Sequence, residues 1–252
     1  MSGTSREDKI NDAFVAMTDA LMQDYDIVEL LSTLLNLCTD ILPVDAGGIL
    51  LVDAVGELEL VASSSEEAEV VETIIIAAGA GPCIDCFTSR APVIIADIAA
   101  TASEWPRFQA TALEQGFRSS YALPMRLRDE VVGVMNLLGS SPGTLSEKDR
   151  GVAQALADIA VLGILHERNF RKPESISEQL HLALDSRILI EQAKGVLSHG
   201  EALTMSESFD ALRSYAKAHG ITLRTAADRA VRREVTTAEI LAAYAPATAT
   251  EQ

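Results

Sequence analysis

The stretch from Ser119 to Gly139, SSYALPMRLRDEVVGVMNLLG, decides the fold class of this chain. Its two apolar halves, SSYALPMRL and VVGVMNLLG, flank the polar triplet Arg128-Asp129-Glu130. Two strand-like runs joined by a short polar turn are typical of a β-hairpin. The stretch therefore predicts two antiparallel strands, and a sheet to which they belong.

Working outward, AGGILLVDA and ELELVASS flank Val55-Gly56 and predict a second hairpin. APVIIADI, residues 91–98, predicts a further strand. Apolar residues at helical spacing predict helices over residues 8–42, 65–77 and 83–90, and another that begins near Trp105-Pro106. This order indicates an α+β fold, in which helices cover an antiparallel sheet. A glycine-rich phosphate loop within a βαβ alternation is missing, which excludes a Rossmann fold.

The last third of the chain reads as helical throughout. A heptad seam predicts a two-stranded coiled coil over residues 146–169, formed by Val152, Leu156, Ile159, Gly163, His166 and Phe170. Lys172-Pro173 interrupts this pattern, because proline disfavours helix at the residue before it. Further helices are predicted from Ile176 to about 198, over 206–219 and over 223–234, followed by a loose tail at 241–252.

Charge is divided unevenly along the chain. The net charge is −17, and residues 1–167 hold 26 Asp and Glu against 9 Lys and Arg. Residues 168–252 hold 11 of each and are neutral. An acidic surface repels polyanions, so only the last third is suited to a phosphate backbone.

The opening MSGTSREDKINDAF lacks the layout of a signal peptide, and no apolar run reaches the length of a membrane span. Three cysteines, an odd number, argue against a disulfide framework. We therefore expect a cytoplasmic protein that does not contact a membrane.

Residues 186–231 carry three blocks: IEQAKGVL (190–197), ESFDALRSYA (207–216) and LRTAA (223–227). In this order and spacing they resemble the ANTAR family of RNA-binding antitermination regulators. The chain departs from the family at Ser208, where alanine is usual, and at Thr225, where aspartate is frequent. Neither departure removes a positive charge.

Five segments of the first two thirds resemble the GAF domain, a PAS-like sensor fold that often precedes ANTAR in actinobacterial regulators. They are GAGPCIDCF (79–87), APVIIADI (91–98), WPRF (105–108), GFRSSYALPM (116–125) and VVGVMNLLG (131–139). The resemblance implies a fold and a sensing role. It names neither a ligand nor a cofactor.

The resemblances imply a GAF domain at 1–165, a helical or coiled-coil connection at 146–185 that overlaps both neighbours, a three-helix ANTAR domain at 174–240 and a flexible tail at 241–252. They imply a homodimer that binds paired stem-loops in a transcript and so promotes antitermination. A small-molecule signal at the GAF domain would control this binding.

Seven residues are the candidate RNA contacts: Arg187, Ala193, Lys194, Gly195, Arg213, Lys217 and Arg224. Lysine and arginine supply most phosphate affinity. Lys194 and Arg213 form the predicted centre of the surface, and Lys217 shares a helix face with Arg213. Gly195 weakens a helix by about 1 kcal/mol, which suggests that a helix or a nucleotide approaches it closely. The alternative is that these are ordinary solvated charges on a helical bundle.

Cys83 and Cys86 are candidates for redox sensing. Cys83 follows Gly-Pro and is expected in the first turn of a helix, where unpaired amides would lower the pKa of its thiol. The alternative is a small buried apolar side chain. Trp105 and Phe108 could line a ligand pocket or simply pack a helix onto the sheet.

Catalysis is not expected. The histidines form no HExxH and accompany no GxSxG serine; they are His166, His181, His199 and His219. The GAF fold also hosts methionine sulfoxide reductases, for which Cys83 and Cys86 are the only conceivable nucleophiles. Two alternatives to RNA binding stay open: a regulator that acts through protein–protein contacts, and a cysteine redox sensor.

Overall fold

The computed structural model describes residues 5–22, 26–53, 55–101, 104–166, 176–201 and 203–244, and gives only the backbone of 165–166, 176–182 and 200–201. Its residues fall into two compact units. One comprises Met1–Gln23 and Ile27–Ala183; the other comprises Leu184–Gln252 together with Asp24–Asp26.

The first unit is built on a five-stranded antiparallel sheet in the order β2-β1-β5-β4-β3. The two predicted hairpins form β1 (Ala46–Val52) with β2 (Leu58–Ser63), and β4 (Ser119–Leu127) with β5 (Glu130–Gly139). Arg128 turns the second hairpin with a φ of 55°. Strand β3 is limited to Val93–Ile95, shorter than the predicted 91–98, and a 3-10 turn follows at Ile98–Ala100.

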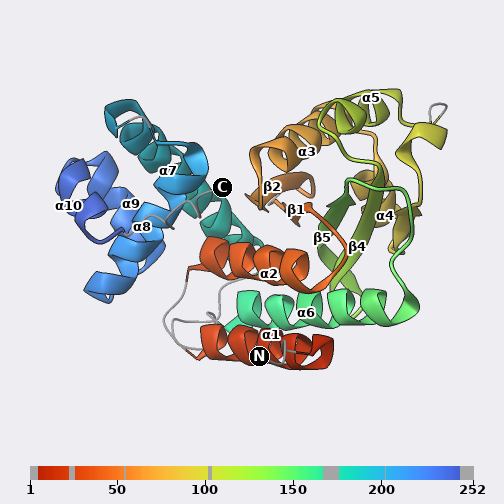
Figure 1. Ribbon diagram of the computed structural model, residues 1–252, viewed down its shortest axis with the longest axis horizontal. Coiled ribbons are helices and arrows are strands. Elements are labelled where there is room, and N and C mark those ends of the chain that lie inside the picture. Colours follow the sequence, from red (N-terminus) through yellow and green to blue (C-terminus); the bar gives the residue numbers. More distant parts are fainter. Residues whose placement is uncertain are drawn as a thin grey trace. The chain divides into compact units, whose positions relative to one another are not determined.

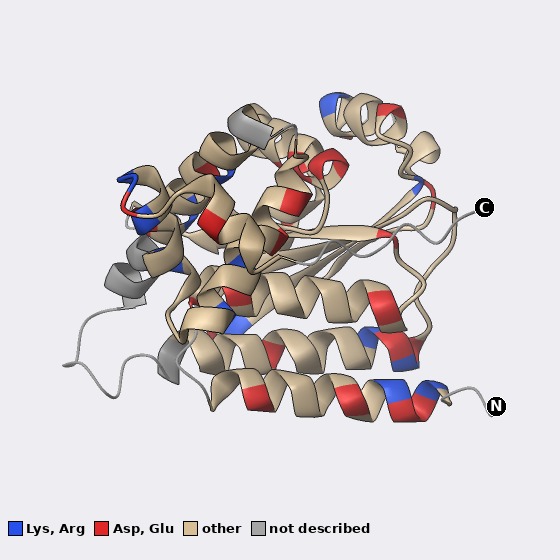
Figure 2. Ribbon diagram, turned by 60° about the vertical axis from the view of Figure 1, so that its left-hand side comes forward, with Lys and Arg blue, Asp and Glu red and all other residues tan. Residues whose placement is uncertain are grey.

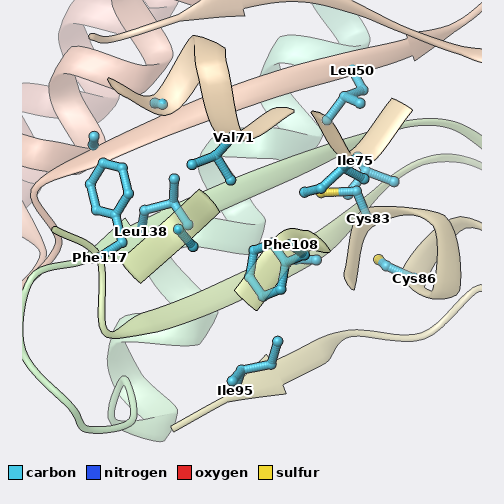
Figure 3. Close-up of a cluster of buried hydrophobic side chains, with 14 of the residues drawn as sticks. Leu50, Val71, Ile75, Cys83, Cys86, Ile95, Phe108, Phe117 and Leu138 are labelled. Atoms are coloured by element: carbon cyan, nitrogen blue, oxygen red, sulfur yellow. The ribbon is translucent and has the colours of Figure 1, made fainter. Parts of the chain in front are cut away.

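Helices cover both faces of the sheet (Figure 1). On one face lie α3 (Glu66–Ala78), α4 (Pro82–Ser89) and α5 (Pro106–Glu114). Ser65 caps α3 as expected, and Trp105 directly precedes α5. Between these helices and the sheet lies an apolar core that includes Leu50, Ile75 and Phe108 (Figure 3).

On the opposite face, α2 (Ile27–Ile41) and α6 (Glu147–His166) pack on the sheet, and α1 (Arg6–Leu21) packs on both of these helices. The heptad positions Leu156 and Gly163 are buried there. Val152 and Ile159 are half-buried, so the chain's own helices cover only part of the seam predicted for a coiled coil. Phe170 and Pro173 lie outside the described residues, as does the side chain of His166.

The second unit is all-helical. Its helices are α7 (Ile176–Glu201, of which the part from Leu184 belongs here), α8 (Met205–His219), α9 (Leu223–Val231) and α10 (Thr237–Ala242). Gly220 ends α8 with a φ of 60°, a conformation that glycine adopts without strain. Both α9 and α10 pack against α8. Helix α10 was not predicted: the last expected helix ended at 234, and the expected loose tail overlaps α10 only at Leu241 and Ala242. Residues 245–252 lie outside the described part.

Candidate functional site

Lys194, expected at the centre of the basic surface, is largely buried on α7. Its side chain is 11% exposed, and its Nζ donates to both carboxylate oxygens of Glu191, at 2.8 and 2.9 Å. A lysine held by a carboxylate one turn away presents little free positive charge. The role of Lys194 as a phosphate contact stays a prediction, and in this structure its ammonium group is engaged by Glu191.

The neighbours of Lys194 differ sharply from one another. Ala193 is completely buried, so its side chain packs in the bundle. Gly195 is exposed, and a Cβ built on it meets nothing within 4 Å. No neighbouring helix in the described part of the chain therefore requires glycine at this position.

Helix α8 brings Arg213 and Lys217 onto adjacent turns. Lys217 is exposed and Arg213 is half-buried. Asp210 lies close enough to Arg213 to interact electrostatically; burial raises the pKa of Asp210, and Arg213 opposes this shift. Of the expected RNA contacts, Lys217 is thus the most accessible cation.

Arg224 and Arg187 are half-buried. Arg224 Nη1 lies 3.5 Å from Ser186 Oγ, which in turn donates to Asp26 Oδ2 at 2.6 Å. Asp26 and Ser186 are both buried, so this is a structural network inside the second unit. Arg224 takes part in it rather than standing on an open surface.

Beyond the expected contacts, α9 carries a cluster of arginines at its end. Arg232 and Arg233 are exposed, and Arg232 Nε pairs with Asp228 Oδ1 at 2.9 Å. Figure 2 shows the contrast with the first unit, where α1, next to the N label, has more acidic than basic positions. The accessible positive charge of the second unit therefore lies on α8 and after α9.

The first unit contains a buried polar cluster formed by Glu72, Cys83, Asn136 and Ser120. Cys83 Sγ donates to Glu72 Oε2 at 3.3 Å, and Asn136 Nδ2 donates to Glu72 Oε1 at 2.6 Å. Ser120 Oγ donates to Asn136 Oδ1 at 2.8 Å. All four residues are fully buried, and they join α3, α4, β5 and β4.

Glycine at position 48 makes room for this cluster. A Cβ built on Gly48 would lie 2.7 Å from Glu72 Cγ, closer than real contacts allow. Glu72 therefore occupies space that any larger residue in strand β1 would take. Burial raises the pKa of Glu72 to about 7, although the hydrogen bonds from Asn136 and Cys83 oppose the shift.

Cys83 lies in the first turn of α4, as predicted, but its thiol is not activated. Burial, followed by the nearby Glu72 carboxylate, raises the pKa of Cys83 well above its ordinary value. The expected lowering is wrong, because complete burial and a carboxylate outweigh the amides of one short helix. Cys86 is buried too, and burial raises the pKa of its thiol to about 12.

The aromatic pair is part of the core. Phe108 is fully buried (Figure 3). Trp105 packs on the same cluster with its ring edge-on to Phe108 at a centroid distance of 6.3 Å. Of the two interpretations left open, packing describes what these rings do. Among the described residues, no group of three or more His, Cys, Asp or Glu could hold a metal ion.

Glu72, Asn136 and Ser120 were not among the predicted site residues. The signal was present for Glu72, because it stands beside Val71 and one turn before Ile75, on the buried side of α3. A glutamate on the apolar face of a predicted helix indicates a buried carboxyl. Asn136 and Ser120 lie in strands whose residues are nearly all buried. Such strands do not alternate between apolar and polar residues, so the sequence pattern did not indicate that these two polar side chains are buried.

The geometry defines a sensor-type α+β unit followed by a helical bundle with accessible cations. A family model for the GAF domain matches residues 24–164, and a family model for the ANTAR domain matches residues 178–231. The chain belongs to the GAF-domain family and carries an ANTAR domain after it, as the sequence resemblance implied. Both are regulatory domains, so the chain is a regulator that joins a sensor domain to an ANTAR domain.

Solved structures of GAF domains share the fold. That of the Acinetobacter phosphoenolpyruvate-protein phosphotransferase is 19% identical with a TM-score of 0.50, and the match covers 65% of this chain and 96% of that one. Its counterpart from Coxiella burnetii is 17% identical with a TM-score of 0.50, covering 64% and 95%. A weaker similarity, which does not bear on the fold, is to free methionine-R-sulfoxide reductase from Neisseria meningitidis: 15% identity and a TM-score of 0.48, covering 74% of this chain and 96% of that one. No curated protein matches the chain.

No described helix is by itself long and apolar enough to cross a membrane. Helices α3 and α4 reach that length and composition only as a pair, which is bent by 60°.

Proposed function

We propose that this protein binds paired stem-loops in transcripts through its ANTAR domain and promotes antitermination, under the control of a signal received by its GAF domain. The observation that carries the proposal is the ANTAR match over residues 178–231, which lies within the last third of the sequence, residues 168–252, whose net charge is zero. Structured RNA is recognised largely through its phosphates and shape, so a neutral unit with accessible cations suits it.

The proposed contact surface centres on α8 rather than on α7. Lys217 is its exposed cation, and Arg213 lies one turn away. Lys194 is committed to Glu191 and contributes to the stability of α7 instead. The acidic first unit favours this arrangement, because it repels RNA from all surfaces except the second unit.

We further propose a homodimer in the cytoplasm. One bundle offers few phosphate contacts, and two linked bundles make the second contact intramolecular, which multiplies avidity. Two adjacent stem-loops would then engage two ANTAR domains of one dimer. A connection through residues 146–185, whose spacing can change with the signal, is the proposed route of control.

The test is direct binding of an RNA that carries two adjacent stem-loops, with a single-stranded RNA of equal length as the competitor. The dissociation constant should rise steeply between about 50 and 200 mM salt. Lys217→Ala should weaken binding of every stem-loop RNA and reduce the salt slope by about 1. Lys9→Ala is the matched control, since Lys9 is an exposed lysine on α1.

Equal losses in the Lys217→Ala and Lys9→Ala variants would contradict the proposal. Binding that barely responds to salt, or capture of a protein instead of RNA, would favour the alternative of a regulator that acts through protein–protein contacts. A cysteine redox sensor is not supported, because Cys83 and Cys86 are buried and the pKa of each thiol is raised.

A further inference from the structure

The outer face of α7 is unusual for a solvent-facing surface. Six residues are exposed between 185 and 199, and all but the adjacent pair Gly195-Val196 are separated by three or four positions, so they form one stripe along the helix: Asp185, Ile188, Gln192, Gly195, Val196 and His199. Ile188 is 57% exposed and Val196 is 41% exposed, and both are among the few large apolar side chains left in solvent. A helix face of this length normally carries several charges.

This stripe is unsuited to RNA. It contains no lysine or arginine, and its only ionisable residues, Asp185 and His199, stand at its two ends. Lys194 is turned to the buried side of α7. At Gly195 the space around a built Cβ is empty, so another backbone can approach closely. These features fit a helix of a protein.

The stripe is also complementary to itself. Ile188 and Val196 each lie four residues from Gln192, and Asp185 and His199 each lie seven residues from it. If a second α7 runs antiparallel with the two-fold axis at Gln192, Ile188 meets the partner's Val196 and Asp185 meets the partner's His199. A parallel pair would instead place Asp185 beside the partner's Asp185, which is repulsive.

We propose that the Asp185–His199 face of α7 docks onto the same face of a second copy of this chain, antiparallel and centred on Gln192. Two-fold interfaces require such self-complementary patches. Gly195 would lie opposite the partner's Leu189 and bring the two helices close together. The inference rests on the homodimer of the proposed function and gives it a contact, but it does not depend on RNA binding.

The contact is small. One helix pair with two apolar pairs falls below the roughly 1,000 Å² of a stable interface, so the docking is weak unless another contact holds the copies together. Trapping by a disulfide is therefore the suitable test, because it accumulates a weak complex.

Gln192→Cys in the full chain should form a disulfide-linked dimer under mild oxidation, since the two-fold axis passes between the two copies of this position. Ser198→Cys, on the same helix but off the stripe, is the control. The native cysteines, Cys38, Cys83 and Cys86, are buried and are shared by both variants. Equal linking in the two variants would overturn the proposal.

The antiparallel orientation of the two α7 helices is tested by mixing two variants, Asp185→Cys and His199→Cys. The antiparallel register predicts links between the two variants and few links within either one. Rapid self-linking of Asp185→Cys would overturn the register. Ile188→Glu should weaken self-association in sedimentation about tenfold, with unchanged circular dichroism as evidence of folding.

The experiments distinguish failure of the proposed α7 interface from failure of the proposed RNA binding. If Gln192→Cys links and stem-loop RNA does not bind, the interface stands and the proposed RNA function falls. If RNA binds and Gln192→Cys does not link, the interface falls and RNA binding stands.

Discussion

Glu72 is a carboxyl with neutral partners in the centre of the first unit. Its hydrogen bonds come from a thiol and an amide, and it forms no ion pair with any described residue. An apolar residue would fill the same space without the desolvation cost of a buried charge. The folded protein therefore keeps a titratable group whose proton affinity differs from that in the unfolded chain.

The stability of the protein should consequently depend on pH through Glu72. Its pKa is about 7 in the folded state against an ordinary 4.5, so the folded state binds the proton more tightly. Stability should be highest at pH 4.5 and below as far as this group is concerned, fall as the pH rises to about 7, and then level off, for a total of about 3 kcal/mol.

Urea unfolding across this pH window measures the effect. Glu72→Gln keeps the shape and, through its carbonyl oxygen, the hydrogen bond from Asn136, while its amide group replaces the oxygen that accepts from Cys83. It cannot ionise, so its stability should change less with pH. Glu67→Gln, at an exposed position of the same helix, should behave like the wild type. Parallel pH profiles for all three proteins would show that Glu72 does not titrate as described.

At the residue scale, the sequence predicted where a residue lies in its helix better than it predicted the pKa of the side chain. The first-turn position of Cys83 was correct, yet the pKa of its thiol moved the other way. The reason is that the effect of a helix terminus depends on burial and on neighbours from distant strands, and Asn136 is 64 residues from Glu72. The ion pair of Lys194 was also not anticipated. Its partner Glu191 is only three residues earlier on the same helix, so this pair could have been recognised in the sequence.

The helices and hairpins themselves followed from apolar periodicity and turn residues. The heptad seam of α6 shows what apolar periodicity cannot predict, namely which partner covers the apolar face of a helix. A spacing of three and four residues reveals that one face of a helix is covered, but it is the same whether the cover is another chain or the chain's own α1 and α2. Only tertiary structure distinguishes the two cases.

Helix α10 was overlooked although its start is marked. Thr236 and Glu239 form a capping box, in which each side chain accepts from the other residue's backbone N–H. Such a pair three residues apart is readable in sequence. The short length of Thr237–Ala242 concealed it, since six residues give less than two helical turns of periodicity.

Thr236→Ala should fray α10. Loss of the cap destabilises a helix by about 1 kcal/mol, and Ile240, which α10 buries, would become more mobile. Hydrogen exchange of the α10 amides should accelerate while that of the sheet in the first unit stays unchanged. Thr237→Ala, the next residue, is the control, because the side chain of Thr236 is the cap. Unaltered exchange in α10 would show that packing on α8 is sufficient.

On the scale of the whole molecule, charge is the property that sequence predicted most directly. The division between an acidic first part and a neutral last part depends only on composition. The boundary between the units was less accessible, because α7 is continuous from Ile176 to Glu201 whereas the units divide after Ala183. A helix that crosses a boundary leaves no break in its periodicity.

The Asp26–Ser186 hydrogen bond means that the second unit is not made by consecutive residues alone. A shortened protein that begins at residue 174 lacks Asp26 and leaves the buried Ser186 hydroxyl without this acceptor. Its thermal midpoint should lie below that of the same unit in the full chain, and Asp26→Ala in the full chain should reproduce the loss. An unchanged midpoint in both proteins would show that the bond adds nothing to stability.

During synthesis, the same bond imposes an order of events. Asp26 is synthesised 160 residues ahead of Ser186, so its carboxylate lacks this partner until those residues have been translated. The carboxy-terminal module can acquire its complete interior only when the much earlier segment around Asp26 folds back onto it. A fusion partner attached at the amino terminus therefore adds bulk close to a residue on which the far module depends.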